Sequence, residues 1–265
     1  MSRLSVENVS FTYGEKPILK NVSLAVEQGE LVAILGHNGS GKTTLLRCIS
    51  GYLTPTAGMV RIGGQAVSSL SARKLAQRMA LVPQNPVMEF DFTVRDIVLM
   101  GRNPHLKRFA GETDADFAAA DAALARTGMT ALSDRSVLTL SGGEWQRTII
   151  ARAICQKSDV AAAQETPVML LDEPVASLDV KHQIEILRLV RSLCRENGIS
   201  ALCVMHDVNL SAHYSDQILL LKGGETLACG SPCNVVTAPL LQEAYGIEAE
   251  VREVQGHPFM IPRYD

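Results

Sequence analysis

The feature of the sequence that most constrains the fold is a glycine-rich segment that directly follows a short apolar run. The run is Leu31-Val32-Ala33-Ile34-Leu35, and the segment after it reads Gly36-His37-Asn38-Gly39-Ser40-Gly41-Lys42-Thr43-Thr44. An unbroken apolar run is typical of a parallel strand that is buried on both faces. The glycines allow successive backbone N–H groups to turn toward one phosphate chain. The pattern G-x-x-x-x-G-K-[ST] therefore predicts a phosphate-binding loop between a strand and a helix that begins near Lys42.

The chemistry expected of this loop is nucleotide binding. Lys42 would reach the β- and γ-phosphates, and the Thr43 hydroxyl would ligate Mg²⁺. The N-terminus of the following helix adds a favourable dipole for negative charge. All nine residues from Gly36 to Thr44 are candidate nucleotide contacts.

A second apolar run ends in two adjacent carboxylates, because residues 168–171 are followed directly by Asp172 and Glu173. Side chains alternate along a strand, so the two carboxylates are expected to point to opposite sides. Asp172 could then hold Mg²⁺ or its water, and Glu173 could act as the general base toward an attacking water. An isolated Asp-Glu pair is more often a solvated strand end. The phosphate-binding loop upstream favours the catalytic interpretation.

A third motif opens a predicted helix and reads Leu140-Ser141-Gly142-Gly143-Glu144. Ser141 and the two glycines expose N–H groups at a helix N-terminus, which favours a second anion site, although the same residues alone could form a plain N-cap and turn. The helical segment around Ser141 is expected to lie away from the phosphate-binding loop. One nucleotide then cannot easily reach both sites within one chain. A head-to-tail dimer with two ATP molecules between its subunits would satisfy both.

The remaining pattern predicts an α/β chain with a helical insertion. Alternating apolar positions before residue 27 indicate a small antiparallel sheet at the N-terminus, and Thr113 followed by Asp116 resembles a capping box. Gly223-Gly224 indicates a tight hairpin. Strands that alternate with helices indicate βαβ crossovers. The expected helices are 93–100, 113–127, 141–156 and 180–197, and the expected later strands are 168–171, 199–205 and 218–221.

Composition excludes several classes of protein. The net charge of −3 comes from 25 basic and 28 acidic residues without long runs of either sign, so nucleic acid is not an expected partner. The sequence has no signal peptide and no run approaching the roughly 20 apolar residues that span a bilayer, which predicts a cytosolic chain. The six cysteines are scattered, which is typical of reduced core thiols, and Cys229 and Cys233 lack a usual zinc or redox spacing.

Taken in this order, the phosphate-binding loop, the Leu140–Glu144 motif and the Leu171-Asp172-Glu173-Pro174 strand end resemble the nucleotide-binding domains of the ATP-binding-cassette (ABC) family. The resemblance covers nearly the whole chain. It implies one domain, 1–265, with a RecA-like P-loop α/β core, an N-terminal antiparallel β subdomain and an α-helical subdomain inserted at about 86–160. It also implies an ATPase that uses ATP and Mg²⁺.

The resemblance implies roles for four further residues. Tyr13 matches the aromatic residue that stacks on adenine, and Gln84 matches the glutamine that touches Mg²⁺ and the attacking water. Asp179 matches the loop that crosses the dimer interface. His206 matches the switch histidine that contacts the γ-phosphate. Without the resemblance, Gln84 would be taken as a surface residue and His206 as a structural or solvated one.

Within the family, the residues 92–105 and the tail around Ala244-Tyr245-Gly246-Ile247 resemble the importers of iron-siderophore, haem and cobalamin. The implied partners are a second copy of the chain, membrane permease subunits and, indirectly, a substrate-binding protein. The implied location is the cytoplasmic face of the inner membrane, as a peripheral subunit. A DNA-maintenance or regulatory ATPase of the same superfamily is the alternative, although the long coiled coil of the DNA-maintenance type is missing between the nucleotide motifs.

The segment 85–105 is expected to dock a cytoplasmic helix of the permease. It directly follows Gln84, and its apolar residues Val87, Met88, Phe90 and Phe92 are expected to be exposed and to form a groove. The alternative is a loop that packs only on its own helical subdomain.

Overall fold

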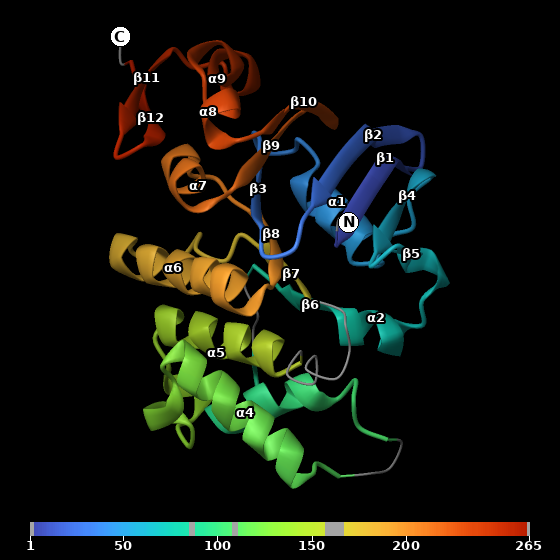
Figure 1. The fold of residues 1–265 in the computed structure, drawn as a ribbon, viewed down its shortest axis with the longest axis vertical. Coiled ribbons are helices and arrows are strands. Elements are labelled where there is room, and N and C mark those ends of the chain that lie inside the picture. Colours follow the sequence, from blue (N-terminus) through green and yellow to red (C-terminus); the bar gives the residue numbers. More distant parts are fainter. Residues whose placement is uncertain (1–2, 85–87, 108–110, 157–166, 264–265) are drawn as a thin grey trace.

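The computed structural model describes residues 3–84, 88–107, 111–156 and 167–263, and its architecture is built around one six-stranded sheet (Figure 1). The strand order is β10-β9-β3-β8-β7-β6. The five strands from β9 to β6 are mutually parallel, and β10 pairs antiparallel with β9 at one edge. The strands are β3 (Leu31–Leu35), β6 (Met79–Val82), β7 (Val168–Asp172), β8 (Ser200–Val204), β9 (Gln217–Lys222) and β10 (Glu225–Gly230).

Both faces of this central sheet are buried, which explains the unbroken apolar runs in its strands. In β3, the side chains of Leu31, Ala33 and Leu35 lie in a hydrophobic cluster shared with the helical part of the molecule. The intervening Val32 and Ile34 lie in a second cluster shared with the N-terminal sheet. Because successive strand residues point to opposite faces, two separate cores require apolar residues at every position.

The N-terminal strands form the predicted antiparallel sheet. Its order is β2-β1-β4-β5, and β1 pairs antiparallel with both neighbours. Helix α1 packs its buried Leu45, Leu46 and Ile49 into the second cluster, between this sheet and the central one. The elements are β1 (Leu4–Tyr13), β2 (Lys16–Val26), α1 (Lys42–Ile49), β4 (Ala57–Ile62), β5 (Gln65–Ala66), η1 (Val67–Ser69) and α2 (Ala72–Arg78).

The predicted helical insertion forms a separate lobe below the central sheet in Figure 1. The bounds are α3 (Val94–Leu99), η2 (Met100–Arg102), α4 (Asp114–Thr127), η3 (Thr130–Leu132), η4 (Val137–Thr139) and α5 (Gly142–Cys155). Capping boxes begin α3, α4 and α5, and the Thr113–Asp116 box confirms the sequence prediction. Gly128 ends α4 in the left-handed conformation. The boundary segments 85–87 and 157–166 lie outside the described residues, so the limits 86–160 remain a prediction.

The C-terminal part covers the other end of the central sheet. Helix α7 contacts the two-stranded β11-β12 sheet, and α6 contacts α5 of the helical lobe. The predicted hairpin at Gly223 and Gly224 joins β9 and β10. The remaining elements are α6 (Val180–Asn197), α7 (Val208–Tyr214), α8 (Pro232–Val235), α9 (Ala238–Tyr245), β11 (Ala249–Val254) and β12 (His257–Pro262).

The cysteines follow the prediction of mostly core thiols. All six are free, and four of them are buried, namely Cys48, Cys155, Cys194 and Cys203. Burial raises the pKa of the Cys48 thiol to about 11 and that of Cys194 to about 12. Among the described residues, no helix combines the length and the apolar character needed to cross a membrane.

A buried ion pair holds the helical lobe together. Arg102 Nε lies 2.7 Å from Asp116 Oδ1, and the two side chains are 3% and 7% exposed. Arg102 also donates to the Cys155 carbonyl, and Asp116 accepts from the Thr113 N–H and hydroxyl. Burial alone would raise the pKa of Asp116, but the hydrogen bonds from Arg102 and Thr113 outweigh it and hold this pKa at about 2.

We expect Arg102→Leu to lower the free energy of unfolding by about 3–5 kcal/mol, because it leaves the Asp116 carboxylate buried without a counter-charge. The control is Arg95→Leu, which removes an ion pair with Asp121 that is 39% and 51% exposed and is expected to cost under about 1 kcal/mol. Urea unfolding measures the cost of each variant. Equal costs for the two variants would contradict a stabilising role for the buried ion pair.

The same ion pair makes stability depend on pH. Since the folded pKa of Asp116 lies below its ordinary value, the stability that Asp116 contributes is present at neutral pH and is lost as the pH falls toward 2.

Candidate active site

The predicted phosphate-binding loop joins the end of β3 to the start of α1. The side chain of Lys42 turns back into the loop, where its Nζ donates to the Gly36 carbonyl at 2.8 Å and to the His37 carbonyl at 3.1 Å. Gly41 precedes the helix with φ of 101°, in the region that favours glycine. The ammonium therefore lies inside the turn, where it can meet a phosphate group bound by the same loop.

A pocket of about 510 Å³ opens beside this loop. Burial lowers the pKa of Lys42, and the charges of Glu173 and Asp172 oppose that shift. The pocket is lined by the predicted residues Asn38, Gly39, Gly41, Lys42, Thr43, Thr44 and Glu173, together with Lys16, Pro17, Ile18 and Gly223. Of the other loop residues, Gly36 and Ser40 are buried beneath it and His37 is exposed.

The carboxylate of Glu173 lies between two side chains from other strand ends. Gln84 Nε2 donates to Glu173 Oε2 at 2.5 Å, and His206 Nε2 lies 2.6 Å from Glu173 Oε1. Glu173 Nα–H donates to the Val204 carbonyl at 3.2 Å. Three predicted site residues far apart in the sequence therefore meet, and Glu173 brings them to the wall of the pocket.

Glu173 is not part of the strand, so the reasoning from strand alternation was wrong for this residue. Strand β7 ends at Asp172, and Glu173 has φ of 48°, which is uncommon for a residue with a side chain. This backbone conformation, rather than the two-residue repeat of a strand, sets the direction of the Glu173 side chain. Such a left-handed residue at a site is a form of local strain that the surrounding contacts must hold.

Asp172 is suited to a cation. Its Oδ1 is buried and lacks a hydrogen-bond partner within the described part of the chain. Burial and the neighbouring charge of Glu173 raise the pKa of Asp172, although Arg47, Lys42 and His206 oppose the shift. No group of three His, Cys, Asp or Glu side chains suited to a metal occurs among the described residues. A Mg²⁺ ion at Asp172 and Thr43 would therefore need oxygen ligands from a nucleotide, as is usual for this ion.

The Ser141 motif forms a capped helix start at a different place. Ser141 N–H donates to Glu144 Oε2 at 2.7 Å, and Glu144 N–H donates to Ser141 Oγ at 3.3 Å. Gly142 and Gly143 pack against Leu178 and His182, at the start of α6. The described residues that line the nucleotide pocket do not include 141–144. Within one chain, the two predicted anion sites are therefore separate.

Tyr13 and Asp179 occupy exposed positions. Tyr13 ends β1, is 47% exposed, and stacks edge-on against Phe11 with ring centroids 4.9 Å apart. It pairs with Lys16, which lines the nucleotide pocket. Asp179 caps α6, and its carboxylate accepts from the His182 N–H at 3.0 Å. The Asp179 side chain is 65% exposed and lies on the side of the Ser141 motif rather than in the pocket.

The pocket also has a wall from β2 and the β9-β10 hairpin, which no sequence motif indicates. Lys16, Pro17 and Ile18 come from the start of β2, and Gly223 comes from the β9-β10 hairpin. Gly224 fits against β2 because a Cβ there would lie 2.1 Å from the Ile18 carbonyl oxygen. The Gly-Gly pair was identified as a hairpin, but nothing in its sequence indicates which strand it meets.

The expectation of exposed apolar residues after Gln84 is only partly correct. Phe90 is 69% exposed. Met88 and Phe92 are instead partly buried. They pack against the hydrophobic cluster that the central sheet shares with the helical lobe. Val87 lies outside the described residues, as do the rest of 85–87.

Comparison with known proteins agrees with this geometry. A family model described as ABC transporter matches residues 19–176, so the chain belongs to the ABC transporter family. The family match and the ATP-binding import proteins among its relatives make it a nucleotide-binding subunit and an ATPase, with the P-loop NTPase fold.

Similar proteins include the hemin import ATP-binding protein HmuV of Bordetella avium, 42% identical over 94% of each chain. The ferric enterobactin transport ATP-binding protein FepC of Escherichia coli is 37% identical over 99% of this chain and 94% of its own. The cobalamin import ATP-binding protein BtuD of Halobacterium salinarum is 43% identical over 88% of this chain and 56% of its own. An inward-facing ABC transporter structure of metal-chelate type superposes with a TM-score of 0.85 at 29% identity, over 99% and 98% of the chains.

We expect Gly36→Ala to weaken ATP binding by about 10-fold or more. A Cβ at Gly36 would lie 2.4 Å from the Leu221 carbonyl oxygen and 2.5 Å from Ser40 Oγ, so the loop must move, and about 1.4 kcal/mol of lost binding energy is tenfold in affinity. Gly39→Ala is the control, because nothing lies within 4 Å of its Cβ and only the cost of positive φ remains. Titration of a fluorescent ATP analogue compares the two. Equal loss in both variants would contradict this account of Gly36.

Proposed function

We propose that the chain is the ATP-hydrolysing subunit of an importer and couples hydrolysis to uptake through a separate permease. The observation that carries the catalytic part is the position of Glu173 at the pocket that contains Lys42, held between Gln84 and His206. The importer part is supported by the similarity to HmuV, FepC and BtuD over most of the chain.

In this proposal Glu173 accepts the proton of the attacking water, and Lys42 and the loop N–H groups bind the β- and γ-phosphates. His206 contacts the γ-phosphate and keeps Glu173 oriented through their 2.6 Å contact. Mg²⁺, when bound, neutralises phosphate charge, and Asp172, Thr43 and Gln84 are the residues that would hold it. The unpartnered Asp172 Oδ1 supports this assignment. Tyr13 is the candidate for stacking on adenine.

The active form in this proposal is a head-to-tail dimer with two ATP molecules between its subunits. The support is the separation of Ser141 from the nucleotide pocket within one chain, together with the capped helix N-terminus that Ser141 begins. Each ATP would then contact the phosphate-binding loop of one subunit and residues 141–144 of the other. Asp179 would lie at the interface between the subunits. ATP closes the dimer, and hydrolysis reopens it.

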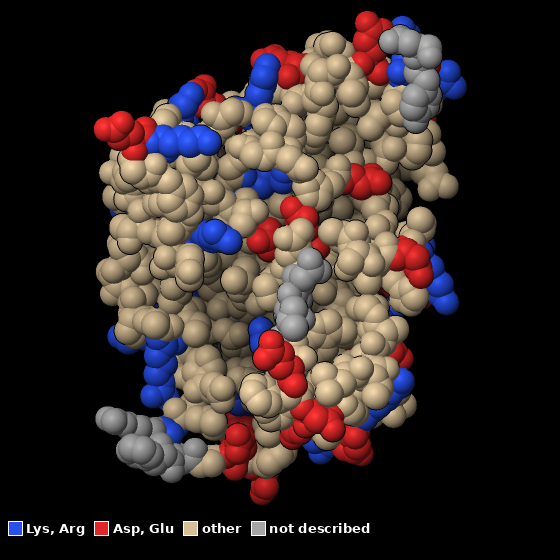
Figure 2. All heavy atoms as spheres, turned by 180° about the vertical axis from the view of Figure 1, so that it is seen from behind, with Lys and Arg blue, Asp and Glu red and all other residues tan. Residues whose placement is uncertain are grey.

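The transported substrate is proposed to be an iron-siderophore, haem or cobalamin, delivered to the permease by a substrate-binding protein. The subunit would be peripheral, on the cytoplasmic side of the inner membrane. The alternative is a DNA-maintenance or regulatory ATPase. Figure 2 displays a face on which basic and acidic side chains are interspersed, and the net charge is −3, which gives little support to contact with a nucleic-acid backbone.

We expect Glu173→Gln to keep ATP binding and to lower hydrolysis by about 10² to 10⁴-fold, the usual effect of losing a general base. The amide keeps the size of the side chain and can still contact Gln84. Glu243→Gln is the control, because its exposed carboxylate lies in α9, outside the residues that line the pocket. Phosphate release and ATP titration separate turnover from binding. Near-normal turnover in Glu173→Gln would show that this residue is not the base.

We propose two surfaces for contact with the permease. The first is the segment 85–105, which retains exposed Phe90 although Met88 and Phe92 pack inward.

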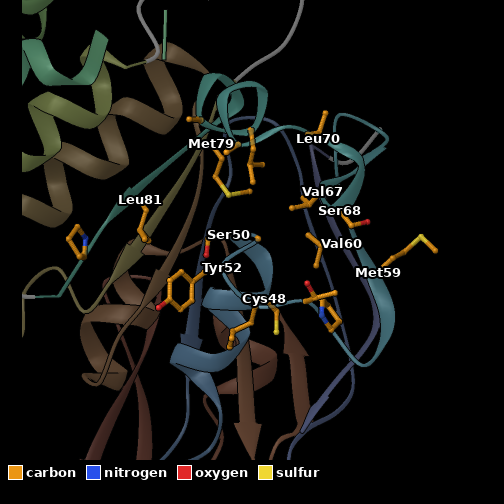
Figure 3. Close-up of a pocket in the computed structure, with 18 of the residues that line it drawn as sticks. Cys48, Ser50, Tyr52, Met59, Val60, Val67, Ser68, Leu70, Met79 and Leu81 are labelled. Carbon is orange, nitrogen blue, oxygen red and sulfur yellow. The ribbon is translucent and has the colours of Figure 1, made fainter. Parts of the chain in front are cut away.

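The second surface is a pocket of about 770 Å³ that reaches Pro83, the residue before Gln84 (Figure 3). It lies among α1, β4, α2 and β6, and its rim carries Tyr52 and Leu81, which are 78% and 43% exposed. An apolar hollow of this kind suits an inserted helix. A partner seated there could move Gln84 and therefore Glu173.

We expect Tyr52→Asp combined with Phe90→Asp to leave basal ATPase activity within a few-fold of normal and to abolish co-purification with the permease. Both side chains are exposed and lie outside the residues that line the nucleotide pocket, so burial of a charge on docking is the expected cause. Phe259→Asp, on the exposed side of β12, is the control. The single variants assign the effect to one surface. Unchanged transport by the double variant would rule out both.

A further inference from the structure

The ring of His182 binds the carboxylate of Asp179 within the first turn of α6. His182 Nδ1 lies 2.8 Å from Asp179 Oδ1 and 2.9 Å from Oδ2, and the His182 N–H donates to Oδ1 at 3.0 Å. The backbone N–H of His182, followed by its ring, lowers the pKa of Asp179. His182 therefore contacts the Asp179 carboxylate through both its ring and its backbone, although the Asp179 side chain is 65% exposed.

The ring of His182 also packs directly against the backbone of the Ser141 motif. A Cβ at Gly143 would lie 2.6 Å from His182 Cδ2, so the backbone of α5 approaches the ring more closely than any residue with a side chain would allow. One residue earlier, Gly142 packs against Leu178, with 3.3 Å between a Cβ at Gly142 and Leu178 Cδ2. The second glycine of the motif is thus required by contact with His182 as well as by exposure of N–H groups.

A second link lies one turn further along both helices. Arg147 Nη2 on α5 donates to Glu185 Oε2 on α6 at 2.8 Å, and Arg147 Nη1 donates to the Thr127 carbonyl at 3.2 Å. Helix α5 belongs to the helical lobe, whereas α6 follows strand β7 of the central sheet. His182 and Glu185, both on α6, therefore connect the start of α6 to the start of α5. This joins the part of the fold around the central sheet to the helical lobe.

We infer that His182 is a positioning residue that holds Ser141 and Asp179 at a fixed spacing, so that both meet the partner's nucleotide together. The inference rests on the proposed head-to-tail dimer, in which both residues serve the other subunit. It assigns to His182 no contact with ATP. The His182 side chain is 36% exposed, contacts Asp179 on one side and Gly143 on the other, and does not line the pocket of its own chain.

The test uses heterodimers in which only one nucleotide site can work. In the reference pair, one subunit carries Lys42→Ala and the other is wild type. The surviving site then combines the wild-type Lys42 with Ser141 and Asp179 of the Lys42→Ala subunit. His182→Ala is added either to the Lys42→Ala subunit or to the wild-type one. The two pairs contain the same substitutions, so a general loss of stability affects both equally. Lys181→Ala, on the exposed neighbour, is placed in the same two positions as a control.

With His182→Ala on the Lys42→Ala subunit, we expect single-turnover hydrolysis to fall roughly 10-fold or more, because small misplacements of positioning groups cost up to about 10² in rate. With His182→Ala on the subunit that keeps Lys42, the rate should stay within about twofold of the reference. In that arrangement His182 contributes only to the nucleotide site that Lys42→Ala has inactivated. Equal rates in the two arrangements would overturn the role of His182, provided that the reference pair associates with ATP. If wild-type subunits do not associate in the presence of ATP, the head-to-tail dimer is wrong and this inference falls with it.

Discussion

The parallel pairing of β3 with β8 and β9, and of β7 with β8 and β6, is the constraint on which the active site depends. Parallel strands end at one common edge, and the functional groups follow those ends. Gly36 follows β3, Glu173 follows β7, His206 comes two residues after β8, Gln84 two residues after β6, and Gly223 follows β9. Ligand sites at the carboxyl ends of parallel strands are the general rule for such sheets. Here the rule brings together groups that are far apart in the sequence.

The charges at this edge are arranged for a ligand that carries both phosphate and a cation. Lys42 is buried and its pKa is lowered, and Asp172 is partly buried and its pKa is raised, because burial disfavours the charged form of each side chain. A phosphate group compensates the first, and a divalent cation compensates the second. Bound phosphate and cation also attract each other directly, so each one strengthens the binding of the other. Nucleotide and metal are therefore expected to bind cooperatively.

Much of the fold could be predicted from sequence because its signals are local. The apolar run before Gly36, the Thr113–Asp116 capping box and the Gly223-Gly224 hairpin each depend on neighbouring residues, and the structure confirms them. Gln84 and His206 were found only through family resemblance, since a single polar residue after a strand carries no pattern. The pocket wall from Lys16 and the contact of His182 with Gly143 depend on packing between distant segments. Strand alternation does not apply to Glu173, because β7 ends at Asp172 and Glu173 takes a left-handed backbone conformation.

The central place of β3 has a consequence for how the chain folds during synthesis. β3 and the phosphate-binding loop are made early, but both strands that flank β3 belong to the last part of the sheet to be translated. Until β8 and β9 emerge, β3 is a short, wholly apolar strand with two open edges, a form that readily pairs with the wrong chain. The N-terminal sheet and α1, which share a core with Val32 and Ile34, can cover one face of β3 in the meantime. The N-terminal sheet would then protect β3 from wrong pairing during synthesis, before its strand β2 contributes to the nucleotide pocket.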